Sequence, residues 1–219
     1  MKRYLFPLTV LVAMAGCAQL PRIYQDPGVA SSPVLSDCLE LFPNGRWQLY
    51  HAIEATVPGG HKRTLTGVSV LSSRDSSIQW ALMTVEGFIL FSGRYNGALT
   101  VERAVAPFDR PGFAQGLVDD LLVLFFAPRA PVIAVGRMQD GGRVCRFGSP
   151  ETTTDLVIQD DGTFSVQQYN SQKRLIRTVL ADAIGSVANR SFARHLVLKN
   201  HGLIGYQLDL TLLEAIPLK

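Results

Sequence analysis

Apolar and polar side chains alternate along much of this chain, and this alternation constrains the fold more than any other feature of the sequence. The clearest run is Ile204–Leu212, in which large apolar residues are separated by glycine or polar residues. Residues 47–57 and 78–83 show a similar pattern. A period of two places every second side chain on the same face of a β-strand. The pattern therefore predicts strands that each bury one face.

Short turn sequences separate these runs. Asn96-Gly97 is a strong hairpin signal, and Pro58-Gly59-Gly60 and Asp160-Asp161-Gly162 also favour turns. Strands at this spacing, joined by tight turns, indicate an antiparallel meander that curls into a barrel or half-barrel. Residues 182–190 are small and polar, which predicts a loop or a short helix. The expected strands are residues 47–57, 64–71, 78–83, 88–93, a strand from Leu99, then 143–148, 154–159, 163–169, 173–180, one around 196–198, and 204–212.

One segment in the middle of the chain has the period of a helix. Between Phe113 and Phe126, apolar residues recur at intervals of three and four, while Asp119 and Asp120 mark a polar side. Pro128 follows and limits the helix. The second half of the segment is apolar on all sides, so it must be covered on more than one side. In a single domain, this predicts a helix that lies across or inside the curved sheet.

The N-terminus has the order of a secretory signal peptide. A basic start, Met1-Lys2-Arg3, precedes an apolar run that ends at Met14, and two small residues then precede Cys17. The run is shorter than the roughly 20 residues that a membrane-spanning helix needs. The Gly-Cys ending resembles the lipobox of bacterial lipoproteins, which implies that Cys17 is acylated and becomes the mature N-terminus. The alternative is an ordinary signal peptide with a cysteine at its cleavage site.

The lipobox resemblance also implies a location and a division of the chain. Ala18 stands where an aspartate usually marks retention at the inner membrane, so the outer membrane is expected. The expected units are residues 1–16 as signal peptide, 17–40 as lipidated N-terminus and flexible Pro/Ser-rich tether, and 41–219 as one domain. The net charge of +3 falls to +1 without Lys2 and Arg3. The sequence has no clustered basic patch of the kind that indicates a nucleic-acid partner.

Cys38 and Cys145 are the two cysteines that remain. Disulfides form and persist in an oxidising compartment, so a Cys38–Cys145 bridge is one hypothesis. The alternative is two buried free thiols. The two residues do not form a C-x-x-C redox motif.

The sequence shows little that favours an enzyme. The four histidines, His51, His61, His195 and His201, lack the spacing of metal ligands, and no metal or cofactor is expected. The sequence contains neither a G-x-S-x-G motif nor a phosphate-binding loop. His51 lies on an otherwise apolar strand face, which predicts a hydrogen-bonded histidine of the core.

Two stretches resemble the LolA/LolB superfamily of lipoprotein carriers, and more closely a group of LolB-like outer-membrane lipoproteins. One stretch is Leu117–Pro128, with paired apolar residues, acidic residues and a long apolar run. The other is Asn200–Leu212, with its Asn, Gly-Tyr and alternating leucines. The chain departs from the group at Phe126-Ala127-Pro128, where Trp-Pro would be expected. The order of tether, strands, apolar helix and further strands matches the superfamily over most of the mature chain.

This resemblance implies a mainly β fold with helices (α+β), an unclosed antiparallel half-barrel of about 10–11 strands with the apolar helix as a lid. Its cavity takes up acyl chains, and an apolar concave space suits such a ligand. For each candidate residue the alternative is ordinary core packing. The residues expected to line the cavity are Trp47, Leu49, Trp80, Leu82, Phe88, Leu90, Leu121 and Phe125.

The expected function is therefore that of a non-enzymatic lipoprotein of the outer membrane, exposed to the periplasm, that binds or transfers a lipid or the acyl chains of a lipoprotein. A periplasmic carrier protein is a possible partner. One alternative is a structural or assembly scaffold whose half-barrel is filled by its own side chains. Another is a lipocalin-like lipid binder, because Gly45-Arg46-Trp47 matches the G-x-W mark of that family.

Overall fold

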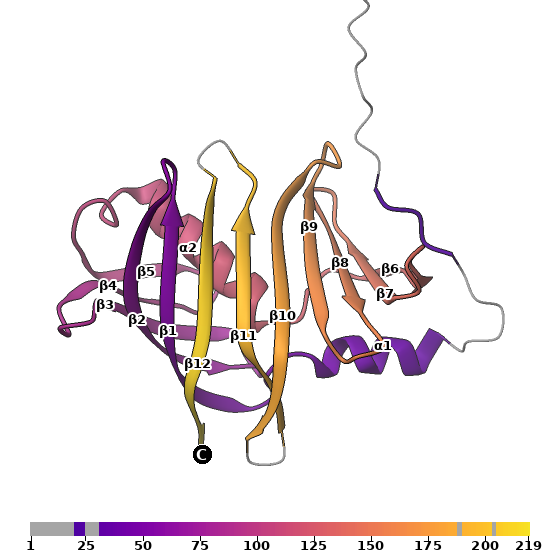
Figure 1. Cartoon of the computed structure of the whole chain (residues 1–219), viewed down its shortest axis with the longest axis horizontal. Helices are drawn as coiled ribbons and strands as arrows, with labels where there is room; N and C mark the ends of the chain where they lie inside the picture. The colour runs from indigo at the N-terminus through magenta and orange to yellow at the C-terminus, as the bar shows by residue number, and fades with distance from the viewer. Residues whose placement is uncertain (1–19, 25–30, 188–189, 203–204) are drawn as a thin grey trace, which may run out of the picture.

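The computed structural model describes residues 20–24, 31–187, 190–202 and 205–219. The expected signal peptide and Cys17 lie outside these residues. The described chain forms one antiparallel sheet and two helices (Figure 1). The sheet has 12 strands, where about 10–11 were expected. The elements are α1 (Ser31–Glu40), β1 (Arg46–Val57), β2 (His61–Ser72), β3 (Ser77–Thr84), β4 (Ile89–Tyr95), β5 (Leu99–Ala104), α2 (Pro111–Phe125), β6 (Val132–Arg137), β7 (Arg143–Gly148), β8 (Thr152–Ile158), β9 (Phe164–Asn170), β10 (Leu175–Val187), β11 (Arg190–Asn200) and β12 (Tyr206–Leu218).

The sheet is unclosed, with β5 at one edge and β6 at the other. Its strand order is β5-β4-β3-β2-β1-β12-β11-β10-β9-β8-β7-β6, so the first and last strands of the chain pair at its centre. α2 connects the two edge strands in sequence. A lipocalin has a closed barrel of eight strands. The lipocalin-like alternative is therefore wrong for this fold.

Two regions of the sheet differ from the sequence-based expectation. β6 had no predicted strand, and β10 continues through residues 182–187, where a loop or short helix was expected. The small residues of β10 are accommodated because they pair along β11, with Asp182 opposite His195. The carboxylate of Asp182 and Nδ1 of His195 are 2.8 Å apart. Tertiary pairing thus overrides the weak local preference of a small, polar segment.

α2 lies across the inner, concave face of the sheet (Figure 1). Pro111 occupies its first turn, where a missing N–H leaves no helical hydrogen bond unmade. Val118, Leu124 and Phe125 on the helix are buried. They join one continuous core with the inward-facing residues of the strands. Among the described residues, no helix is both long enough and apolar enough to span a bilayer.

The segment expected to be a flexible tether is partly ordered, which corrects that expectation. Residues 31–40 form α1, and Val34 and Cys38 on this helix are buried. A disulfide joins Cys38 to Cys145 on β7, with their Cα atoms 6.5 Å apart. The side chains of Asp37 and Arg143 also form an ion pair. A Pro/Ser-rich composition predicted no apolar period here, but two buried positions and one covalent link are enough to fix a short helix.

Residues 20–24 also contact the domain, at the outer edge strand β6. Tyr24 and Arg137 exchange two backbone hydrogen bonds of 2.9 and 2.8 Å. Arg146 donates through Nη2 to the carbonyl oxygen of Pro21, at 2.8 Å, while buried Asp155 holds the same guanidinium. The segment therefore covers part of an edge that would otherwise present unpaired backbone groups.

Gly136 permits this contact, and we expect Gly136→Ala to release residues 20–24. A Cβ atom at Gly136 would lie 2.4 Å from the carbonyl oxygen of Tyr24, which is a backbone atom and has little room to yield. Hydrogen exchange at the amides of Tyr24 and Arg137 should become fast in this variant. Gly116→Ala is the matched control, because a Cβ there meets nothing within 4 Å. Retained protection of Tyr24 in Gly136→Ala would contradict this account.

Candidate functional site

Core side chains pack between α2 and the sheet. A cavity of about 20 Å³ lies among them, which is room for about one water molecule. It is bounded by α2, by inward-facing strand residues and by the segment after α1. Its lining residues are Leu41, Pro43, Leu49, His51, Leu124, Phe125, Phe164, Phe192, Ala193, Leu196 and Leu212.

Six of the eight predicted cavity residues lie in this apolar interior. Trp47, Leu49, Trp80, Leu82, Leu121 and Phe125 are all buried members of the core. Only Leu49 and Phe125 border the small cavity. Phe164 and Phe192 were not singled out in the sequence, although Phe164 lies near the start of the expected strand 163–169 and Phe192 lies a few residues before the strand expected around 196–198. Large aromatic residues at strand ends are the signal that would have found them.

Phe88 and Leu90 do not belong to the interior, which corrects two of the predicted positions. Phe88 is 52% exposed, between β3 and β4, with the guanidinium of Arg103 over its ring. Leu90 lies on β4 and is half-buried, whereas the buried residues of that strand are Phe91 and Gly93. Residues 88–91 are all apolar, so alternation could not show which pair faces inward. A bulge in the β3–β4 pairing at Leu82/Met83 determines which residues of β4 face inward.

A buried ionic cluster attaches α2 to the sheet. Nε of Arg177, on β10, lies 2.7 Å from the carboxylate of Asp120, on α2. Tyr206, on β12, donates a hydrogen bond to the same carboxylate. Arg177 also donates to Asp119, at 3.4 Å. Among the described residues, every hydrogen bond from a side chain of α2 to the sheet involves Asp119 or Asp120.

Burial dominates the electrostatics of this cluster. The Asp120 side chain is 2% exposed and that of Arg177 is 12% exposed. Burial raises the pKa of Asp120, while the contacts with Tyr206 and Arg177 offset part of the rise. Burial, together with the neighbouring carboxylate of Asp120, also raises the pKa of Tyr206. The cluster is therefore a desolvated polar attachment in an otherwise apolar interface.

His51 is a neutral histidine of the core. It is 3% exposed, and its ring lies 5.5 Å from that of Phe125 on α2. Its side chain forms no hydrogen bond with any described residue, so the prediction of a hydrogen-bonded histidine is wrong in that respect. Burial lowers the pKa of His51 from 6.5 to about 4. The neutral imidazole borders the cavity and carries one donor and one acceptor.

The His51 pKa leads us to expect a loss of stability in mild acid. The unfolded chain binds a proton at His51 near pH 6.5, whereas the folded chain resists protonation until about pH 4. Stability is therefore unaffected by this group above pH 6.5 and falls as the pH drops toward 4. We expect a loss of about 2–3 kcal/mol between pH 7 and pH 4.5. Urea unfolding at both pH values measures it.

His51→Phe should remove this part of the pH dependence, because the side chain no longer titrates. His61→Gln is the control, since His61 is exposed on β2. An identical pH dependence in His51→Phe and the native protein would contradict the assignment.

Two further polar groups on the inner face lack hydrogen-bond partners. Nε1 of Trp80 is the one fully buried side-chain nitrogen or oxygen without a partner among the described residues. Ser69, which is 6% exposed, pairs directly with Trp80 across β2 and β3. Its hydroxyl also has no hydrogen-bond partner within the part of the chain that the structure describes. Native proteins leave few such groups unpaired, and each needs an explanation.

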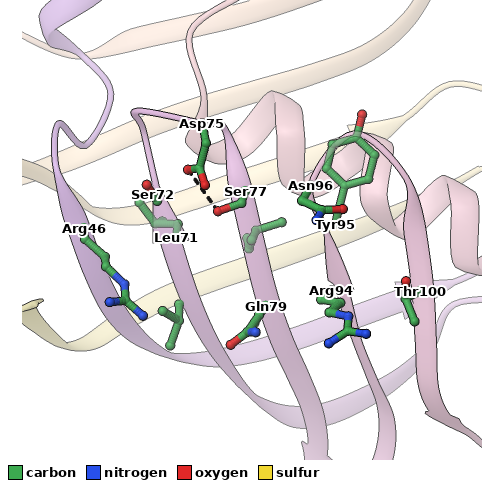
Figure 2. A pocket seen from close by; sticks show the side chains of 12 residues that line it. Arg46, Leu71, Ser72, Asp75, Ser77, Gln79, Arg94, Tyr95, Asn96 and Thr100 are labelled. Carbon is green, nitrogen blue, oxygen red and sulfur yellow. Dashed lines mark hydrogen bonds between the residues drawn. The ribbon is translucent and has the colours of Figure 1, made fainter.

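A larger and more polar hollow lies on the outer face of β1–β5 (Figure 2). It has a volume of about 400 Å³. Arg46, Gln79 and Arg94 project to the same side in Figure 2, and Gln79 pairs directly with Arg94 across the strands. Asp75, at its rim, accepts a hydrogen bond of 3.0 Å from Ser77. Leu71 and Ile78, which belong to the core, also line this hollow.

The comparisons with known proteins find matches of structure and none of sequence. No protein-family model matches the chain, and no curated protein does. Among solved structures, a LolA superfamily protein from Nitrosomonas europaea matches with a TM-score of 0.60 and 10% identity, over 87% of this chain and 94% of that one. A putative outer membrane lipoprotein-sorting protein domain from Vibrio parahaemolyticus matches with a TM-score of 0.52 and 9% identity, over 84% and 90%. Within the described residues, no three His, Cys, Asp or Glu side chains gather in a way that would hold a metal ion. The chain therefore shares the fold of these two structures, and in this chain that fold is an unclosed antiparallel half-barrel with a helix across its inner face.

Proposed function

We propose that this protein is a lipoprotein, anchored to the outer membrane through acylated Cys17, that binds or transfers a lipid or the acyl chains of a lipoprotein. The observation that carries the proposal is the seating of α2. Its apolar side chains fill the concave face of an open sheet, and its polar attachment is limited to Asp119 and Asp120. The interior that α2 now occupies is an apolar concave surface of the kind that binds hydrophobic ligands.

The small cavity means that a ligand must displace part of α2. About 20 Å³ cannot hold an acyl chain. Each CH₂ group that becomes buried stabilises a bound chain by about 0.8 kcal/mol, so an acyl chain can replace the contacts of several helix side chains. Such an exchange needs no catalytic group. It needs only a graded affinity of the ligand for three partners in turn. These are a donor, such as a periplasmic carrier protein, then this domain, and then the membrane.

Native mass spectrometry with lipid extraction tests the proposal. We would use the mature chain, residues 17–219, with Cys17→Ser so that no attached lipid competes. We expect a co-purified acyl species at one per chain that added fatty acid displaces. A chain that stays free of ligand after lipid is offered would overturn the proposal. Mass analysis of the wild-type chain, expressed with residues 1–16, separately tests the acylation of Cys17.

Leu124→Ala should increase acyl binding while lowering stability. Leu124 lies on α2, is 6% exposed and borders the cavity. Truncation enlarges the cavity and removes a contact that holds α2 closed, at a cost of about 2–5 kcal/mol in unfolding free energy. Displacement of a fluorescent fatty acid should show a lower Kd. Leu39→Ala on α1 is the matched control, because Leu39 is 44% exposed. Equal fatty-acid affinity of the native protein, Leu124→Ala and Leu39→Ala would show that the cavity takes no part in ligand binding.

The packed core between α2 and the sheet favours a second function. A half-barrel that its own side chains fill could serve as a structural or assembly scaffold at the outer membrane. In that case α2 would stay seated, and hydrogen exchange in α2 would be as slow with lipid as without it.

A further inference from the structure

We propose that the interior recognises a neutral acyl ester, such as the acylglycerol part of a lipid or lipoprotein, through the unpaired polar groups of Trp80, Ser69 and His51. This inference rests on the proposed function and names the ligand chemistry that the interior selects. It concerns the inner face of β1, β2 and β3. The other buried residues of that face are apolar or glycine.

The three side chains are neighbours by register. Ser69 pairs directly with Trp80 across β2 and β3. His51 pairs with Gly67, two residues before Ser69 on the same face of β2. Such diagonal neighbours in an antiparallel pair lie about 7–8 Å apart, and direct neighbours about 5 Å apart. The three residues are thus neighbours on one face of the sheet, within the core.

Their hydrogen-bonding capacity defines the ligand. Trp80 Nε1 can only donate, so it needs an acceptor oxygen. The Ser69 hydroxyl and the neutral His51 imidazole can each donate and accept. Nε1 of Trp80 is fully buried, and Ser69 and His51 as residues are 6% and 3% exposed. None of the three carries a charge that would offset the burial of a phosphate or a carboxylate. An ester carbonyl with adjacent hydroxyl or ester oxygens fits this set, whereas a pure hydrocarbon would leave the groups unpaired.

The other tryptophan of the chain shows the contrast. Trp47 is also buried on the inner face of the sheet, but its Nε1 donates to the carbonyl oxygen of Asn44 at 2.9 Å. Its donor is satisfied within the fold. Trp80 packs against Phe91, with ring centroids 5.5 Å apart, and this contact leaves its N–H free. The two residues therefore provide a matched pair of variants.

A pair of ligands that differ in one carbonyl tests the inference. 1-Monolauroylglycerol carries an ester, and 1-O-dodecylglycerol is an ether with a chain of the same length. Each would displace a naphthylamine fluorophore from the mature chain with Cys17→Ser. We expect the ester to bind about tenfold more tightly, because the ether leaves the buried donor unpaired. Trp80→Phe should reduce this ratio to less than about threefold, and Trp47→Phe should leave it unchanged.

Further measurements separate the possible outcomes. Ser69→Ala is a smaller change that should also lower the ratio, so the inference does not depend on the folding of Trp80→Phe. Equal binding of ester and ether by the native protein, or an unchanged ratio in both Trp80→Phe and Ser69→Ala, would overturn the inference and leave the proposed function standing. Failure of both ligands to displace the fluorophore would overturn the proposed function itself. A diacylated lipopeptide, compared with free dioctanoylglycerol, distinguishes a lipoprotein from a free lipid as the source of the ester.

Discussion

Replacement of Asp120 by alanine is expected to lower the free energy of unfolding by about 3–5 kcal/mol, because it leaves a buried guanidinium with only the longer contact to the half-exposed Asp119 as counter-charge. Asp120 is 1% exposed, and both Arg177 and Tyr206 hydrogen-bond to its carboxylate. Removal of that carboxylate leaves two buried donors in a region that water reaches poorly. Urea unfolding at pH 7 measures the loss. The same change should also weaken the attachment of α2 to β10 and β12.

Asp119→Ala is the matched control for this experiment. Asp119 is the preceding residue of the same helix, its side chain is 42% exposed, and its contact with Arg177 is longer, at 3.4 Å. We expect a loss below about 1 kcal/mol, as is usual for exposed ion pairs. Hydrogen exchange in α2 should increase strongly in Asp120→Ala and little in Asp119→Ala. Equal losses of stability in the two variants would show that burial of the cluster does not matter.

Removal of the Cys38–Cys145 disulfide is expected to cost about 3–5 kcal/mol. The bond joins residues separated by 107 positions, and a crosslink over a loop of this length restricts the unfolded chain strongly. Both cysteines are fully buried, so the double variant Cys38→Ala/Cys145→Ala avoids burying new polar groups. Denaturant unfolding of the double variant and of the oxidised native protein gives the difference. α1 should also lose hydrogen-exchange protection, because the bond attaches it to β7.

Thiol labelling provides an independent check on the disulfide. Cys38 and Cys145 should resist alkylation in the unfolded, unreduced chain and react after reduction. Two thiols that react without reductant would contradict the bond and restore the alternative of free buried cysteines.

The alternation of apolar and polar residues predicted most strands of the sheet, but it failed where the alternation was ambiguous. The alternation around Trp47 and Leu49 correctly predicted which face of β1 is buried. Residues 88–91 are apolar at every position, so the sequence did not show which of them face inward. Phe88 and Leu90 were therefore placed on the wrong face. β6 was missed because a short edge strand between two prolines and a glycine-rich turn has little periodic signal. Its strand geometry comes from pairing with β7.

The candidate site was only partly accessible to sequence reasoning. A helix that is apolar on all sides predicted burial of Leu121 and Phe125 against the sheet. The sequence could not show that α2 leaves only about 20 Å³ of free space, because side chains that fill a core and side chains that line a cavity have the same composition. Nor could it show that Nε1 of Trp80 is unpaired while Nε1 of Trp47 is paired. That distinction depends on Asn44, which reaches Trp47 through a local turn.

The pairing of β1 with β12 has a consequence for the order in which the chain folds. These two strands form the middle of the sheet, with Arg46 opposite Leu218. Contacts between residues so distant in sequence form late, because the intervening chain must first be brought together. While the polypeptide is being synthesised, β1 has β2 on one side and no strand on the other until the last 13-residue strand has emerged. The nascent chain thus exposes one unpaired edge of a central strand until synthesis is nearly complete, which makes the completion of the C-terminus the step that protects this edge from aggregation.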